Sequence, residues 1–147
     1  MEQNQDKIDW SYLSLNPNAI HFLEQNKEKI NWKHLSENPN AIHLLKQNKH
    51  RIDWMNLSQN PKVICLLEQN QDKINWDCLS FNPNAIHLLQ ENKGKIYWQW
   101  LSANPNAMHL LKQNQDKINW YNFACNPSIF VPTEKNQIQE LILNLQF

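Results

Sequence analysis

Four histidines, His21, His43, His87 and His109, recur at intervals of 22 or 44 residues and are the side chains in this chain best suited to metal chemistry. Imidazoles that share a zinc ion must each place a nitrogen about 2.0 to 2.1 Å from the metal. Equivalent positions on successive packed helices lie about 8 to 10 Å apart. The spacing therefore predicts separate histidines, either solvated or hydrogen-bonded between repeats, and no metal site.

No other residues form a recognisable catalytic set. The cysteines Cys65, Cys78 and Cys125 occupy three different positions of the sequence repeat, so its plan requires neither a disulfide nor a metal. No nucleophile recurs beside a fixed basic partner, and a phosphate-binding loop would need more glycine than the single Gly94. The sequence therefore predicts a protein that is not an enzyme, has no cofactor and resides in a reducing compartment.

The histidines are positioned by a 22-residue repeat, Lys-Ile-Asn-Trp-x-x-Leu-Ser-x-Asn-Pro-Asn-Ala-Ile-His-Leu-Leu, that recurs without insertions. A strict period of this length is typical of stacked repeat proteins. The tryptophans at equivalent positions are Trp10, Trp32, Trp54, Trp76, Trp98 and Trp120.

Each repeat predicts two helices. In the second copy, Asn31 is a suitable N-cap for a short helix that starts at Trp32. Asn38 is expected to cap a second helix whose first residue is Pro39, because the fixed φ of proline suits that position. This helix should run to about Gln47 and end at Asn48 in a left-handed conformation.

The expected fold is therefore all-α, an α-solenoid of about six two-helix repeats over residues 4–131. Each repeat should combine a very short α or 3₁₀ helix with a longer α-helix, and a capping helix should follow at 133–147. We expect one domain, 1–147. A leucine-rich repeat is excluded because the Asn-Pro helix start lies where its strand of alternating leucines would have to be.

The motif Ile-Asn-Trp-x-x-Leu-Ser-x-Asn-Pro-Asn-Ala-Ile-His-Leu-Leu resembles the tandem 22-residue repeat proteins encoded by large DNA viruses of amoebae, such as the marseilleviruses. The resemblance covers residues 4–131. The alternation of shorter and longer helices is similar to leucine-rich repeat variant solenoids. The viral resemblance implies a protein of the infected-cell cytoplasm or nucleus, or of the virion. It carries no activity, cofactor or catalytic residue with it.

The tryptophans are predicted to form the buried core, in preference to a ladder that stacks bases or sugars. A column of cations could in principle attract nucleic acid, but the formal net charge is zero. Cations shortly after a helix end are also favoured by the helix dipole. We therefore expect nucleic-acid binding only as the less favoured alternative. The column consists of Lys7, Lys29, Arg51, Lys73, Lys95 and Lys117.

The positions two and five residues after each tryptophan vary between copies, and a scaffold can vary its contact surface while it keeps its core. These positions predict a protein-binding surface of Tyr12, His34, Cys78, Phe81, Trp100 and Ala103, the last four forming an apolar patch. The open alternative is that Phe81 and Trp100 tuck between layers. The predicted function is a scaffold for protein–protein interaction or assembly.

Two further expectations concern burial and the ends of the chain. Trp98 should point into the core and Trp100 to the surface, because residues two apart on a helix point about 200° apart. The first copy lacks the body of a preceding helix, so it is expected to seek cover from a second copy of the chain. The polar start and the absence of a long apolar run predict a protein that does not span a membrane.

Overall fold

A computed structural model of the chain describes residues 6–130, and within this range every regular element is an α-helix or a 3₁₀ helix. The predicted all-α solenoid of paired helices is confirmed. The chain divides after Leu79 into two compact units, which we describe separately. The single domain expected for 1–147 stays a prediction, and the expected capping helix at 133–147 lies outside the described residues.

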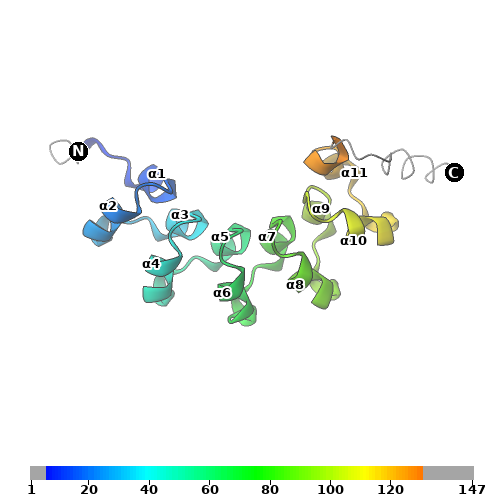
Figure 1. Cartoon of the computed structure of the whole chain (residues 1–147), viewed down its shortest axis with the longest axis horizontal. Helices are drawn as coiled ribbons and strands as arrows, with labels where there is room; N and C mark the ends of the chain where they lie inside the picture. Colours follow the sequence, from blue (N-terminus) through cyan, green and yellow to red (C-terminus); the bar gives the residue numbers. More distant parts are fainter. Residues whose placement is uncertain (1–5, 131–147) are drawn as a thin grey trace. The chain divides into compact units, whose positions relative to one another are not determined.

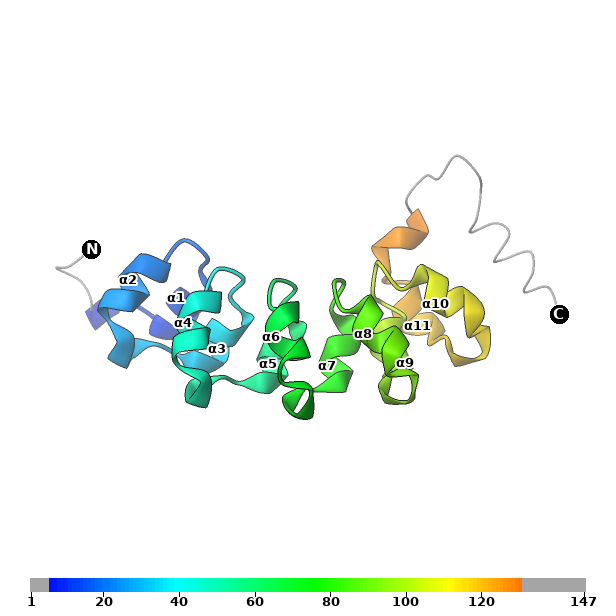
Figure 2. The same ribbon diagram turned by 60° about the horizontal axis from the view of Figure 1, so that its bottom comes forward.

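The first unit contains three repeats, each made of two α-helices and a 3₁₀ turn. The first helices pack on one another in chain order, α1 on α3 and α3 on α5, and the second helices form a parallel row (Figures 1 and 2). The elements are α1 (Trp10–Leu15), α2 (Ile20–Gln25), η2 (Lys27–Lys29), α3 (Trp32–Glu37), α4 (Ile42–Gln47), η3 (Lys49–Arg51), α5 (Trp54–Gln59), α6 (Ile64–Glu68) and η4 (Gln71–Lys73).

The boundary between the units falls inside α7 (Trp76–Phe81), and the second unit continues the same alternation. Its described elements are α8 (Ile86–Glu91), η5 (Lys93–Lys95), α9 (Trp98–Leu101), α10 (Met108–Gln113), η6 (Gln115–Lys117), α11 (Trp120–Phe123) and η7 (Pro127–Phe130).

The start of the first helix in each repeat is as predicted. The Asn31 side chain accepts a hydrogen bond from the amide of His34 at 3.2 Å, which satisfies one of the free amides of α3. Asp53 does the same for α5, at 2.9 Å from the amide of Asn56. The local capping signal was therefore sufficient to place this helix.

The predicted start of the second helix is wrong. Helix α4 begins at Ile42, and Ala41 occupies its N-cap position without a side-chain hydrogen bond. Asn38 instead closes a turn: its side chain accepts from the amide of Asn40 at 3.0 Å, and its carbonyl accepts from the amide of Ala41 at 3.2 Å. Because this turn uses Pro39, α4 has six residues and is no longer than α3.

The predicted helix end is right in place and wrong in conformation. Helix α4 ends at Gln47 as expected, but Asn48 has a φ of −127° and is not left-handed. Its side-chain amide donates to the carbonyl of Leu44 at 2.9 Å, which satisfies a carbonyl of the last turn. The chain then enters a 3₁₀ turn, η3, that the sequence pattern did not predict.

Leucines, and not tryptophans, form the core. In both units the fully buried large side chains are leucines, such as Leu35 and Leu44 in the first unit and Leu101 and Leu111 in the second. The prediction that the tryptophans are buried is wrong, because those from Trp10 to Trp98 are half-buried and Trp120 is 49% exposed. Trp98 and Trp100 are both half-buried, so they do not divide into core and surface.

A repeated serine links each repeat to the next. The hydroxyl of Ser36 donates to the carbonyl of Trp32 at 2.8 Å and accepts from the amide of Asp53 at 3.1 Å. Ser14 makes the same two bonds, to Trp10 and from Asn31. This buried hydroxyl therefore satisfies a backbone group in each of two adjacent repeats.

The asparagine before each proline makes a second link. The side-chain amide of Asn38 donates to the carbonyls of Ser14 at 2.9 Å and Asn16 at 3.0 Å, both in the preceding repeat. In the second unit, Asn104 donates in the same way to Ser80 at 3.0 Å and Asn82 at 2.9 Å. These asparagines are buried, so their amides supply partners that water cannot reach.

We predict that Asn38→Ala lowers the free energy of unfolding by about 2 to 3 kcal/mol, because it leaves the buried carbonyl of Ser14 without its side-chain donor and removes one of the two donors to the carbonyl of Asn16. Asn16→Ala is the matched control, since exposed Asn16 makes the same turn bond to Asn18 without donating to a described repeat. It should cost less than about 1 kcal/mol. Denaturant melts measure both, and equal losses would contradict an inter-repeat role.

Candidate interaction surface

The position two residues after each tryptophan, predicted to face solvent, is mainly a contact between repeats. The Nδ1 of His34 donates to the carbonyl of Ser11 at 3.0 Å, and His34 is half-buried. Asn56 is buried and donates to the carbonyl of Lys33 at 3.2 Å. Tyr12, in the first described repeat, is the exception at 73% exposed. The variation at this position therefore reflects packing between repeats as well as surface.

Cys78 does not belong to an accessible patch, which corrects the prediction. The residue is only 1% exposed, and its sulfur accepts a hydrogen bond from the side-chain amide of Gln59 at 3.4 Å. Burial raises the pKa of the Cys78 thiol, so the reactive thiolate is disfavoured. Cys78 fills the space that Asn56 fills one repeat earlier, and we assign it to packing.

Three aromatic side chains of the second unit form an exposed cluster. The rings of Phe81 and Trp100 meet edge to face, with centroids 6.2 Å apart, and those of Tyr97 and Trp100 do so at 6.4 Å. Phe81 is 46% and Tyr97 is 38% exposed, while Trp100 is half-buried between them. We call Phe81, Tyr97 and Trp100 the aromatic cluster. Ala103, also predicted for this patch, is half-buried.

Tyr97 was missed by the sequence analysis, although the sequence contains a signal for it. It occupies the N-cap position, where the other copies have aspartate or asparagine. Helix α9 consequently has no side-chain cap at its start. Replacement of a capping residue by an alanine-like residue costs about 1 kcal/mol. At this one repeat a stabilising residue has therefore been exchanged for an exposed aromatic ring.

Three cations of the column lie over tryptophan rings. The guanidinium carbon of Arg51 lies 5.2 Å from the centroid of the Trp32 ring, and the ammonium of Lys73 lies 5.1 Å from that of Trp54. In the second unit, Lys117 lies 4.9 Å from Trp98. Each of these cations lies in the 3₁₀ turn that follows the two helices of its tryptophan's repeat. A cation over an aromatic face is attracted by its negative quadrupole, which explains why half-buried tryptophans are tolerated here.

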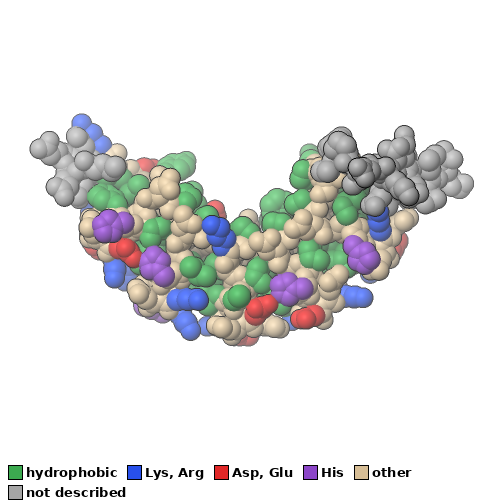
Figure 3. Space-filling model, viewed as in Figure 1, with side chains coloured by type: hydrophobic (Ala, Val, Ile, Leu, Met, Phe, Trp, Pro, Cys, Tyr) green, Lys and Arg blue, Asp and Glu red, His purple; other side chains and the backbone are tan. Residues whose placement is uncertain are grey.

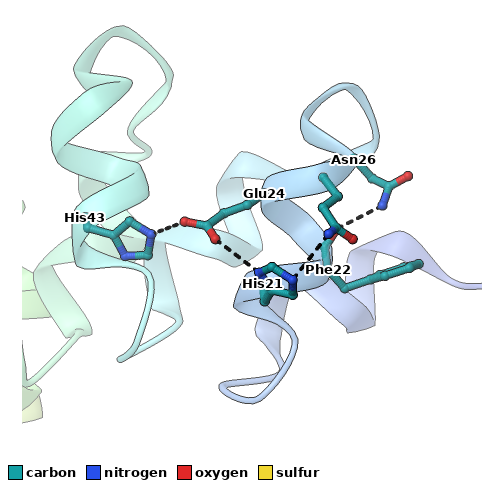
Figure 4. A network of polar contacts seen from close by, with 6 residues as sticks. His21, Phe22, Glu24, Asn26 and His43 are labelled. Carbon is teal, nitrogen blue, oxygen red and sulfur yellow. Dashed lines mark hydrogen bonds and ion pairs between the residues drawn. The ribbon is translucent and has the colours of Figure 1, made fainter.

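The four recurring histidines, His21, His43, His87 and His109, are exposed, as predicted. In Figure 3 the purple imidazoles lie at the surface, among scattered blue and red side chains. Figure 4 shows a place where two of them share a partner: the carboxylate of Glu24 on α2 accepts a hydrogen bond from the Nε2 of His43 on α4. Its second oxygen lies 3.8 Å from the Nδ1 of His21. This contact links two repeats of the first unit.

The hydrogen bond from His43 is the main cause that lowers the pKa of Glu24, assisted by the charges of His43, His21 and Lys27 and opposed by partial burial. Within residues 6–130, no three histidine, cysteine, aspartate or glutamate side chains are placed to hold a metal ion. We therefore describe the contact of Glu24 with His43 as an electrostatic contact between two repeats.

The comparisons with known proteins found no similar protein: no family model matches the chain, and no significant match was found among curated proteins or solved structures. In the part of the chain that the structure describes, no helix is both long and apolar enough to cross a bilayer. The candidate surface therefore has to be interpreted from its own geometry.

We predict that Tyr97→Asn raises the free energy of unfolding by about 1 kcal/mol, because it restores the missing cap of α9. The reverse exchange, Asn119→Tyr, removes the bond that Asn119 accepts from the amide of Asn122 and should lower it by a similar amount. Denaturant unfolding of both variants measures the effect. A stability loss in Tyr97→Asn would mean that the tyrosine contributes more to folding than a cap would.

We predict that His43→Ala raises the pKa of Glu24 toward its ordinary value of 4.5. Because the folded-state pKa is lowered, Glu24 stabilises the fold above its unfolded pKa, and this contribution is lost as the pH falls through the folded-state pKa. A carboxyl-detected NMR titration measures the change. His50→Ala is the control, since His50 is not among the groups that lower this pKa. An unchanged Glu24 titration in His43→Ala would contradict the assignment.

Proposed function

We propose that this chain is a non-enzymatic repeat scaffold that binds another protein through the aromatic cluster of Phe81, Tyr97 and Trp100. The single observation that carries the proposal is Tyr97, an exposed aromatic residue at a position where the repeat otherwise has a stabilising cap. A residue that departs from a local stability rule is expected at functional sites.

The geometry of the cluster suits a protein interface. Tyrosine and tryptophan are enriched among the residues that contribute most to protein binding, and they act best when their surroundings exclude water. Trp100 is half-buried and touches both neighbouring rings edge to face, so its orientation is set before binding. Little side-chain entropy is then lost on association, which favours affinity.

Nucleic-acid binding is less well supported. The formal net charge of the chain is zero, so the chain as a whole supplies no long-range attraction to a polyanion. The proposal also includes the viral resemblance and an intracellular or virion location. It further includes self-association through the first repeat. The binding experiment below depends on none of these.

The test is selection of peptides from a random phage-displayed library on the immobilised full chain. We expect peptides whose binding is weakened at least tenfold by Trp100→Ala, about 1.4 kcal/mol, because truncation of a central aromatic residue typically costs more than 1 kcal/mol. The matched control is Tyr121→Ala, which removes an aromatic side chain that is 84% exposed in the same unit.

Circular dichroism melts of both variants establish that each is folded at the assay temperature. If the selected peptides bind Trp100→Ala as well as they bind the wild type, or if the library yields no binders, the aromatic cluster is not the binding surface. A labelled single-stranded oligonucleotide that binds more tightly than the peptides would favour the nucleic-acid alternative.

A further inference from the structure

The 3₁₀ turns of the first unit carry a concentration of exposed cations. η2 contributes Lys27 and Lys29, η3 contributes Lys49 and Arg51, and η4 contributes Lys73. All five side chains are exposed. We call these five residues the basic rim. It lies in a different unit from the aromatic cluster.

The three turns lie along the same edge of the first unit. Each turn follows the second helix of its repeat and is closed by the same bond, from the amide of its last residue to the carbonyl of the preceding asparagine. The bonds of Lys29, Arg51 and Lys73 measure 2.9, 2.9 and 3.0 Å. Since the repeats pack in chain order, the turns form a row, which Figures 1 and 2 show at the lower edge of the first unit.

Two of the five residues of the basic rim are held in place without being neutralised. Arg51 and Lys73 lie over the rings of Trp32 and Trp54, which restricts their long side chains while leaving their charge intact. Within the described residues, no carboxylate forms an ion pair with any of the five cations. An interface that starts with ordered side chains loses less entropy on binding.

The acidic groups near the basic rim are few. The turns contain Glu28 and Asp72, so five cations exceed two carboxylates by three, and η3 contains no acid at all. Glu24, on the preceding helix, feels the charge of Lys27 and is engaged with His43. Among the three turns of the first unit, η3 therefore has the largest excess of positive charge, from Lys49 and Arg51.

We propose that the basic rim binds a short acidic peptide segment of a partner protein. The negative side chains of such a segment would face the positive side chains of η3, a turn that contains no acidic residue. A nucleic-acid strand presents phosphates continuously and would meet Glu28 on one side of that turn and Asp72 on the other. The neutral net charge also supplies no long-range attraction to a polyanion.

The experiment measures fluorescence anisotropy of a labelled hexaglutamate peptide with the full chain at low ionic strength. A labelled oligothymidine of equal charge is the comparison probe. We expect the peptide to bind more tightly than the oligonucleotide, and its affinity to fall as salt is raised. The double variant Lys49→Gln with Arg51→Gln should weaken peptide binding at least about tenfold.

Two further variants keep the test independent of folding. Lys27→Gln with Lys29→Gln removes two rim cations without disturbing the two tryptophan contacts described above, and it should weaken binding at least about threefold. Lys93→Gln with Lys95→Gln removes two cations from η5 of the other unit, a turn that is also free of acid, so this variant tests whether two cations alone bind the peptide. Binding should stay within about twofold.

Trp100→Ala should not change hexaglutamate binding, which separates this proposal from that of the aromatic cluster. The proposal is overturned if the oligonucleotide binds at least as tightly as the peptide, if neither probe binds at low salt, or if the η5 variant weakens peptide binding as much as the η3 variant does.

Discussion

The fold depends on satisfying backbone groups that become buried when one repeat packs on the next. A short helix leaves amides and carbonyls free at both ends, and stacking hides them from water. The asparagine before the proline, as in Asn38, provides both an acceptor for a backbone amide and a donor for backbone carbonyls. The oxygen of Asn38 closes its own turn, and its amide reaches the carbonyls of Ser14 and Asn16 in the preceding repeat. Few side chains carry both a donor and an acceptor in so small a volume.

This constraint accounts for the strict period. The serine and asparagine links both require that a residue in one repeat reach a fixed backbone atom in another, so an inserted residue would break several buried hydrogen bonds at once. The leucines could tolerate some repacking, because apolar contacts are not directional. The polar links therefore determine the register, while the leucines supply the driving force for burial.

The same constraint decides where the surface is free to differ. Side chains that reach the neighbouring repeat are buried or hydrogen-bonded there, so they cannot contact a partner. His34 and Cys78 are examples. Tyr97 differs, because its side chain is exposed and the cap that it lacks belongs to helix α9. The aromatic cluster arises where that exchange coincides with Phe81 and Trp100. The basic rim lies on turns whose backbone bonds do not depend on the identity of the side chains.

By itself, the sequence determined the repeat, the helical class and the start of each first helix, because period and capping are local properties that are visible in the order of residues. It also indicated the contact between Phe81 and Trp100. The tertiary structure decided the role of the Asn-Pro pair. Both a helix cap and a closed turn suit those two residues, and the acceptors in the preceding repeat favour the turn. It likewise decided which apolar residues are buried. Leucines fill the interior. The tryptophans Trp32, Trp54 and Trp98 stay half-buried, each with a cation of the 3₁₀ turn of its own repeat over its ring.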